Sequence, residues 1–309
     1  MKYFHKINLR HSREITLRQL GNMAKTPIRL KDIGGCNGKN DVIFIHSATA
    51  TKNVIYFGGD IQNYPEEMPK RGEIKSYREW NLENTATLLH KHFEDSNIFI
   101  VKPSRMHLRT FSVFENFVPS NDFGSPDHIA DYGGLKHLIC LIMNCFKELK
   151  ERITTGKSSA IGNGSEENKN KSCLKEKELL PLVLTGFSKG CVVLNQFLYE
   201  LELAKLNPSF SDFVKQIESM YWLDGGHSGG SNTWINDDKV LRSLKDTEIK
   251  IHVHVTPYQV KDMNRPWIGQ EKKKFVSKLK RLGITVTDTL HFDDEEVSLD
   301  NHFRVLESF

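Results

Sequence analysis

The hydrophobic residues of this 309-residue chain are grouped in short runs that alternate with helical patterns. Short apolar runs bounded by Gly, Pro or charged residues are typical of strands buried on both faces, whereas apolar residues three and four positions apart indicate helices. The predicted strands cover residues 28–32, 41–46, 53–57, 97–101, 182–185, 219–223, 250–255 and 284–290. The predicted helices cover residues 80–93, 128–153, 189–205 and 270–282. This alternation predicts an α/β protein with a mostly parallel sheet and helices on both of its faces.

The segment 104–128 shows no clean period but contains several phenylalanines, including Phe111, Phe114, Phe117 and Phe123. Two interpretations remain open. The aromatic side chains form a flap over a functional site, in which case they favour an apolar ligand, or they pack a long loop against the core.

Residues 154–178 are rich in Ser, Gly, Asn, Lys and Glu and offer almost nothing to bury, which predicts a disordered insertion. Strands and helices continue to alternate on both sides of it, so the insertion interrupts one domain and does not separate two. We therefore expect a basic amino-terminal arm over residues 1–35 and a single domain over residues 36–309.

The sequence Gly186-Phe187-Ser188-Lys189-Gly190 lies between a predicted strand and a predicted helix. A Gly-x-Ser-x-Gly pattern in that context is typical of a nucleophile elbow, a sharp turn that presents the serine at its tip. The flanking glycines allow neighbouring backbone to approach the turn closely. Ser188 is therefore the candidate nucleophile.

A nucleophilic serine needs a histidine as base and an acid that orients the histidine. Such groups gather at the carboxyl ends of parallel strands. His302 follows the last predicted strand and opens the terminal helix, and His291, nearer that strand, is the alternative base. Asp224 ends the strand 219–223, and Asp262 follows the strand 250–255. Both acids preserve the chain order Ser, Asp, His, so the sequence leaves the choice between them open.

An acyl-transfer site also needs two N–H donors for the oxyanion. The backbone N–H of Lys189, directly after the serine, is the first candidate donor. The second is expected in the turn after the strand 53–57, where Gly58 and Gly59 let the backbone approach a substrate.

Charge and composition exclude several other classes. The net charge of +4, from 43 basic and 39 acidic residues, is too small for an electrostatic nucleic-acid binder. No apolar run approaches the roughly 18–20 residues that span a bilayer, so no transmembrane segment is expected. Residues 225–230 lack the lysine of a phosphate-binding loop, and His252 and His254 fit the polar face of a strand better than a metal site. Neither a cofactor nor a metal ion is expected.

The five cysteines form no Cys-x-x-Cys pair and are odd in number. This pattern indicates neither a disulfide framework nor a zinc site, and a reducing compartment fits it best.

The first 31 residues carry eight Lys or Arg and one acid, Glu14. The bias is typical of a mitochondrial transit peptide, and an ordinary basic arm has the same composition. The absence of an apolar segment after the basic start argues against a secretory signal.

The elbow, the Gly58-Gly59-Asp60 turn and His302 together resemble the α/β-hydrolase superfamily. The longer stretches 221–234, 255–260 and 301–305 resemble an uncharacterised animal family of mitochondrial hydrolase-like proteins. The resemblance implies an α/β-hydrolase-like sheet and a mitochondrial location, with the matrix expected and the cytoplasm as the alternative. Lys189 beside the serine departs from the commonest esterase pattern.

Two functional hypotheses follow from these patterns. The first is a serine hydrolase that cleaves an ester or thioester of a small-molecule acyl substrate through an acyl-enzyme at Ser188. The second is a catalytically weak or inactive hydrolase-like protein that acts as a mitochondrial interaction or regulatory factor and binds a protein partner, because a fold does not by itself imply its function.

Overall fold

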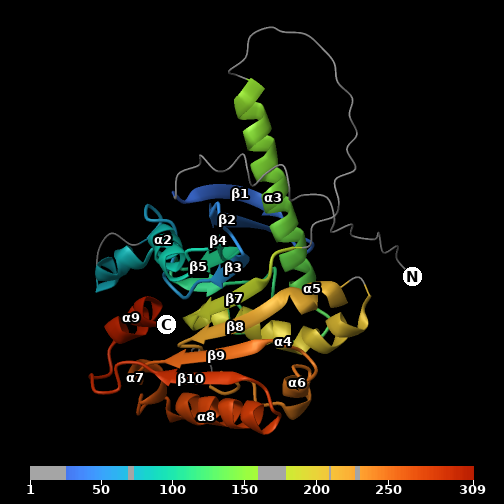
Figure 1. Cartoon of the computed structure of the whole chain (residues 1–309). Helices are drawn as coiled ribbons and strands as arrows, with labels where there is room; N and C mark the ends of the chain where they lie inside the picture. Colours follow the sequence, from blue (N-terminus) through green and yellow to red (C-terminus); the bar gives the residue numbers. More distant parts are fainter. Residues whose placement is uncertain (1–25, 69–72, 159–178, 209, 227–229) are drawn as a thin grey trace.

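The computed structural model describes residues 26–68, 73–158, 179–208, 210–226 and 230–309, and Figure 1 shows the arrangement of their helices and strands. The central sheet has eight strands in the order β1-β2-β4-β3-β7-β8-β9-β10. These strands are β1 (Ile28–Gly34), β2 (Lys39–Ile45), β3 (Lys52–Phe57), β4 (Ser96–Val101), β7 (Leu182–Phe187), β8 (Ile217–Leu223), β9 (Lys250–Val255) and β10 (Val286–Leu290). A separate hairpin is formed by β5 (Arg105–His107) and β6 (Phe111–Val113).

The sheet is mostly parallel. Strand β2 pairs antiparallel with β1 and with β4, whereas every pairing from β4 through β3, β7, β8 and β9 to β10 is parallel. An eight-stranded sheet with this order and one reversed strand near its amino-terminal edge is the arrangement of α/β-hydrolases. The predicted fold class is therefore confirmed.

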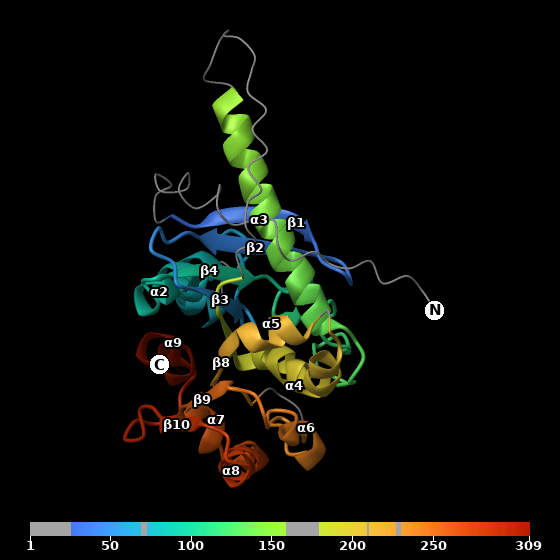
Figure 2. The same ribbon diagram turned by 45° about the vertical axis from the view of Figure 1, so that its right-hand side comes forward.

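Helices cover both faces of the sheet (Figures 1 and 2). One face carries α2 (Leu82–His92) and α9 (Leu299–Ser308), and the other carries α3 (Gly134–Ser158), α4 (Cys191–Leu206) and α8 (Pro266–Arg281). The shorter helices are α5 (Ser211–Gln216), α6 (Asp238–Arg242), α7 (Pro257–Val260) and the 3₁₀ helices η1 (Glu73–Trp80) and η2 (Ser188–Gly190).

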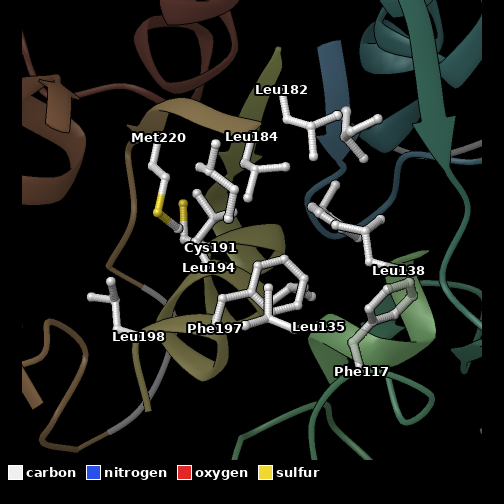
Figure 3. Packing of buried hydrophobic residues seen from close by; sticks show 14 of the residues in the cluster. Phe117, Leu135, Leu138, Leu182, Leu184, Cys191, Leu194, Phe197, Leu198 and Met220 are labelled. Carbon is white, nitrogen blue, oxygen red and sulfur yellow. The ribbon is translucent and has the colours of Figure 1, made fainter. Parts of the chain in front are cut away.

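Successive side chains of the strands point to opposite faces of the sheet and belong to two hydrophobic cores, one on each face. In β2, Phe44 belongs to the core under α3 and α4, whereas its neighbour Ile45 belongs to the core under α2 and α9. Figure 3 shows Leu184 of β7 packed near Leu194 and Phe197 of α4 in the first of these cores. Strand β7 is buried along its whole length, so the turn that follows it is anchored to the packed core.

The segment 104–128 packs mainly as part of the core. Phe114 and Phe117 are buried and stack edge-on against Phe57, whereas Phe123 is 48% exposed. The predicted helix at 128–153 begins six residues later, at Gly134, because the backbone N–H groups at its start are bound by the side chain of Glu200. That contact comes from α4 and leaves no local sequence signal.

The predicted insertion and arm are described only in part. Helix α3 continues to Ser158, and residues 159–178 lie outside the described residues. Of the predicted arm, residues 1–25 also lie outside, and β1 occupies 28–34 as the edge strand of the sheet.

The expectation of no disulfide is wrong for one cysteine pair. Cys36, in the turn between β1 and β2, is bonded to Cys140 of α3 across 104 residues of sequence. Their spacing carries no motif, and only the docking of α3 beside β1 brings them together. Cys145 and Cys191 are free and buried, and Cys173 lies outside the described residues. Within the described ranges, no helix combines the length and apolar character needed to cross a membrane.

Candidate active site

Ser188 occupies the tip of a sharp turn between β7 and α4. Its φ of 50° lies in the left-handed region, which a residue with a side chain rarely adopts. The turn needs glycine on both sides of the serine. A Cβ on Gly190 would lie 2.0 Å from the carbonyl oxygen of Phe57, and one on Gly186 would lie 2.9 Å from Cα of Cys191. The predicted elbow is thus present, with the strained backbone that this motif requires.

His302 and Asp224 meet although 78 residues separate them. Nδ1 of His302 lies 2.8 Å from Oδ2 of Asp224, and both side chains are buried. Since a carboxylate only accepts hydrogen bonds, Nδ1 is the donor of this contact, and in the neutral ring Nε2 is then the nitrogen with the lone pair. The ring of His302 is held between Phe187 and Tyr258, with ring centres 4.7 and 4.8 Å away.

Asp224 is fixed by several donors around it. Thr256 donates its backbone N–H to Oδ1 at 2.7 Å and its hydroxyl to Oδ2 at 2.6 Å. The backbone of Asp224 has a φ of 46°, and its carbonyl accepts a hydrogen bond from Gln259. Sequence reasoning missed Thr256, although its position directly after β9 was a usable signal because strand ends surround the site.

The two alternative residues from the sequence have other partners. Asp262 accepts hydrogen bonds from Nε of Arg265 at 2.6 Å and from the backbone N–H of Asn264. Nε2 of His291 lies 2.9 Å from Nδ1 of His254. Burial lowers the pKa of His254 to about 4, and burial also lowers the pKa of His291. The His302 contact is therefore made by Asp224.

Ser188 and His302 open into one cavity of about 140 Å³. Its lining residues are Asp60, Ile61, Ser188, Lys189, Gly226, Tyr258, Gln259, Arg265, Leu299, His302 and Phe303. Most of these side chains are polar or charged, and the aromatic residues of 111–123 are not among them. The geometry brings a serine hydroxyl and a histidine–aspartate pair to one small pocket of mixed polar and apolar character.

The turn after β3 packs directly on the elbow. A Cβ on Gly59 would lie 2.9 Å from Cβ of Ser188. The N–H of Gly59 donates to Oε1 of Gln62 at 2.9 Å. The N–H of Asp60 has no acceptor within the described part of the chain. The turn therefore offers a candidate oxyanion donor one residue after Gly58 and Gly59, the two positions predicted from the sequence.

Lys189 and Asp60 place opposite charges beside the serine. The side chain of Lys189 is buried and donates from Nζ to the carbonyl of Phe123 at 3.2 Å. Asp60 accepts the backbone N–H of Ser112 at 2.8 Å. Burial raises the pKa of Asp60 and lowers the pKa of Lys189, and the attraction between the two charges opposes both shifts.

No group of three or more His, Cys, Asp or Glu side chains suited to a metal ion occurs among the described residues. His252 and His254 stack with Tyr221 along the sheet face, and the ring centres of His252 and Tyr221 lie 4.1 Å apart.

Comparison with known proteins identifies close relatives. The model of the C2orf69 family matches residues 29–179 and 152–285. A mouse protein named mitochondrial protein C2orf69 homolog is 45% identical over 283 residues, which cover 83% of this chain and 78% of the mouse protein. The human mitochondrial protein C2orf69 is 45% identical over 285 residues, covering 83% and 74% of the two chains. A zebrafish homolog is 36% identical over 305 residues, covering 91% and 85%.

Solved structures resemble this chain more distantly. A thermostable esterase superposes with a TM-score of 0.43 at 15% identity, and the match covers 92% of this chain and 60% of the esterase chain. A lipase/esterase from Lactobacillus plantarum superposes with a TM-score of 0.40 at 11% identity, and the match covers 88% of this chain and 90% of the lipase/esterase chain. At these scores the fold assignment rests on the strand order described above.

Proposed function

The chain belongs to the C2orf69 family, and from the geometry of its own site we propose that it is a serine hydrolase acting on an ester or thioester. The observation that carries the proposal is the 2.8 Å contact between His302 Nδ1 and Asp224 Oδ2, in a pocket shared with the strained Ser188. A serine hydroxyl is a weak nucleophile by itself, and this arrangement supplies the base that it lacks.

In the proposed reaction Oγ of Ser188 attacks the substrate carbonyl while Nε2 of His302 takes its proton. Asp224 stabilises the resulting imidazolium and holds the ring in place. The backbone N–H of Lys189 and one N–H of the 58–60 turn bind the oxyanion, with Asp60 preferred because the N–H of Gly59 is already bound by Gln62. His302 then gives the proton to the leaving alcohol or thiol, and water releases the acyl group from Ser188 by the reverse sequence.

The pocket favours a short acyl group. Its volume of about 140 Å³ is below the roughly 300–1,000 Å³ of pockets that hold drug-sized ligands. Polar and apolar side chains both line it, and the aromatic segment 111–123 contributes no lining residue. A long acyl chain would therefore exceed the space inside the cavity.

Labelling with a fluorophosphonate probe tests the proposal, because the probe phosphonylates only an activated serine. Wild-type protein should be labelled, and both Ser188→Ala and His302→Ala should lose the label. His291→Ala is the matched control, since this second histidine is engaged by His254. Likewise Asp224→Asn should lose most labelling while Asp262→Asn keeps it. Folded wild-type protein that takes up no label would reject the hydrolase and favour an interaction or regulatory factor.

We further propose that the protein acts in mitochondria, in the matrix. The relatives are named mitochondrial proteins, and the first 31 residues have the basic composition of a transit peptide. Protease protection of the full chain in isolated mitochondria, before and after rupture of the outer membrane, tests the matrix assignment. Digestion once the outer membrane is ruptured would contradict it.

A further inference from the structure

We infer that Arg265 is an anion-binding group of the pocket, so that the substrate carries a carboxylate or phosphate close to its scissile bond. The inference rests on the proposed hydrolase function and names its substrate class. Arg265 lines the same cavity as Ser188 and His302. A guanidinium is the side chain best suited to hold a planar or tetrahedral anion through two parallel hydrogen bonds.

The guanidinium of Arg265 is held in place by two neighbours. Asp262 accepts its Nε at 2.6 Å, and the guanidinium carbon lies 5.2 Å from the centre of the Tyr258 ring. Tyr258 also packs against His302 on the other side. Asp262 takes the Nε–H and the side chain of Tyr258 is a second hydrogen-bond partner, and a guanidinium has further N–H donors on its two terminal nitrogens with which to hold an anion. Asp262, a rival for the catalytic acid in the sequence, is here a positioning residue for Arg265.

The carboxylates around the cavity are each engaged by a donor or a cation. Asp60 is the remaining carboxylate in the lining, and it is engaged by the backbone N–H of Ser112 and faces the charge of Lys189. Asp224 is buried behind His302. Arg265 is therefore the cation of the lining that lies nearest solvent, with its side chain 24% exposed, and Lys189 is almost fully buried.

Because the pocket is small, the positive charge of Arg265 can discriminate between anionic and neutral acyl groups. A cavity of about 140 Å³ brings a group bound at Arg265 within a few bonds of the carbonyl attacked by Ser188. Binding energy from a group outside the reacting bond then serves to position the carbonyl. We expect the enzyme to prefer short acyl groups that end in an anion over neutral acyl groups of the same length.

Three 4-nitrophenyl esters with chains of equal length test this preference: hemiglutarate with a carboxylate end, 4-phosphonobutanoate with a phosphonate end, and glutaramate with a neutral amide end. Wild-type kcat/KM for at least one anionic ester should exceed that for the amide by about tenfold or more. The better of the two anions identifies whether carboxylate or phosphate is the natural group. Equal kcat/KM for all three esters would overturn the inference and leave the hydrolase function intact.

Variants assign the preference to Arg265. Arg265→Gln should lower kcat/KM for the anionic esters by about 10- to 100-fold and for the amide by less than about threefold. Asp262→Asn should give a smaller loss in the same direction, mainly in KM, because it loosens the guanidinium without removing it. An Arg265→Gln variant that lowers all three values equally would contradict selective anion binding.

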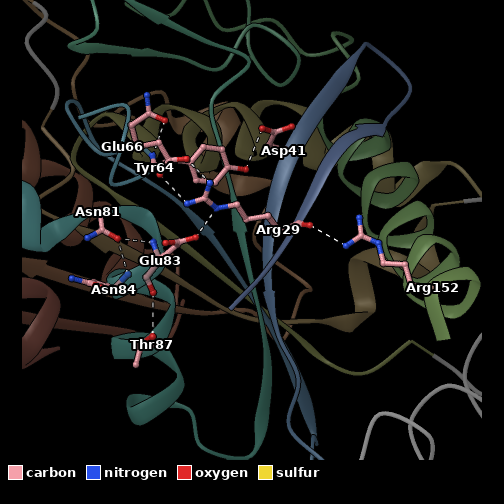
Figure 4. A network of polar contacts seen from close by, with 10 residues as sticks. Arg29, Asp41, Tyr64, Glu66, Asn81, Glu83, Asn84, Thr87 and Arg152 are labelled. Atoms are coloured by element: carbon pink, nitrogen blue, oxygen red, sulfur yellow. Dashed lines mark hydrogen bonds and ion pairs between the residues drawn. The ribbon is translucent and has the colours of Figure 1, made fainter. Parts of the chain in front are cut away.

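Arg29 provides a matched control. Its guanidinium also pairs with carboxylates, Glu66 and Glu83, and lies 4.0 Å from the centre of the Tyr64 ring, but it sits on edge strand β1 (Figure 4). Arg29→Gln should leave the ratio of anionic to neutral kcat/KM unchanged.

Binding separates this inference from a failure of catalysis. Isothermal titration calorimetry of the Ser188→Ala variant with glutarate and 4-phosphonobutanoate, each compared with glutaramide, needs no turnover. Binding of an anion that disappears in Ser188→Ala/Arg265→Gln supports the site even when no ester is cleaved. If no ester is cleaved, absence of anion binding to Ser188→Ala would by itself reject the inference.

Discussion

The hydroxyl of Thr256 donates a hydrogen bond of 2.6 Å to Oδ2 of Asp224, the same oxygen that lies 2.8 Å from Nδ1 of His302. Asp224 has no exposed surface, and a buried carboxylate is costly unless donors surround it. Thr256 satisfies both oxygens, because its backbone N–H binds Oδ1. It therefore holds the carboxylate in the orientation that meets the histidine.

Thr256→Val should slow fluorophosphonate labelling of Ser188 by about tenfold. The substitution keeps the shape of the side chain but removes the hydroxyl, and a hydrogen bond to a charged group contributes roughly 1.5–3 kcal/mol. Thr256→Ser, which keeps the hydroxyl, should label at close to the wild-type rate. Equal labelling rates for the valine and serine variants would show that this donor does not support the histidine–aspartate pair.

Gly59→Ala should impair Ser188 directly. The added methyl would lie 2.9 Å from Cβ of Ser188 and 3.0 Å from the ring of Phe187, so the turn or the elbow must move. We expect at least about a tenfold loss of kcat/KM, because small displacements of reacting groups are costly. Gly230→Ala is the control, since no atom lies within 4 Å of its added Cβ. Full activity of Gly59→Ala would argue against a close-packed elbow.

Glu200→Gln should lower the free energy of unfolding by about 2–3 kcal/mol. The buried carboxylate accepts backbone N–H groups of Gly133, Gly134 and Leu135 at the start of α3 and the side chain of Gln196. An amide in its place turns an NH₂ group toward these donors. Urea unfolding measures the loss.

Glu202→Gln is the comparison for that experiment. Glu202 is exposed and pairs only at the surface with Lys205, so its replacement should change the free energy of unfolding by less than about 0.5 kcal/mol. Similar losses for the two variants would mean that Glu200 does not stabilise the helix start.

Stability should fall as the pH is lowered from about 6.5 toward 4, in part through His137. Its Nδ1 accepts the backbone N–H of Asn37, so Nε2 is the protonated nitrogen and lies 2.9 Å from Oδ1 of Asn40. Burial lowers the pKa of His137 to about 4, whereas an unfolded histidine has a pKa near 6.5. The unfolded chain therefore binds the extra proton in this window, and acid favours unfolding.

His137→Gln replaces the titrating group with an amide that can still donate and accept. The free energy of unfolding of this variant should depend less on pH between pH 7 and 5 than that of the wild type, as measured by urea unfolding at both values. Some dependence should remain, because burial also lowers the pKa of His128 and His254 to about 4. Parallel curves for variant and wild type would contradict the role of His137.

Local patterns were enough to place most elements. Buried apolar runs mark β2, β3, β4, β8 and β9 because a strand covered on both faces needs a continuous hydrophobic sequence. The elbow at Ser188 is also local, since the glycines that permit its φ of 50° are its neighbours in the chain. The amino acid sequence by itself therefore determined the fold class and the candidate nucleophile.

Contacts between distant segments were decided by the tertiary structure. Asp224 and Asp262 both follow strands, and only the packing of α9 against the sheet brings His302 to the first and leaves the second beside Arg265. The start of α3 depends on Glu200 of α4, and the bond between Cys36 and Cys140 on the docking of α3. Such contacts arise from packing geometry across many residues of sequence, so no periodicity or short motif encodes them.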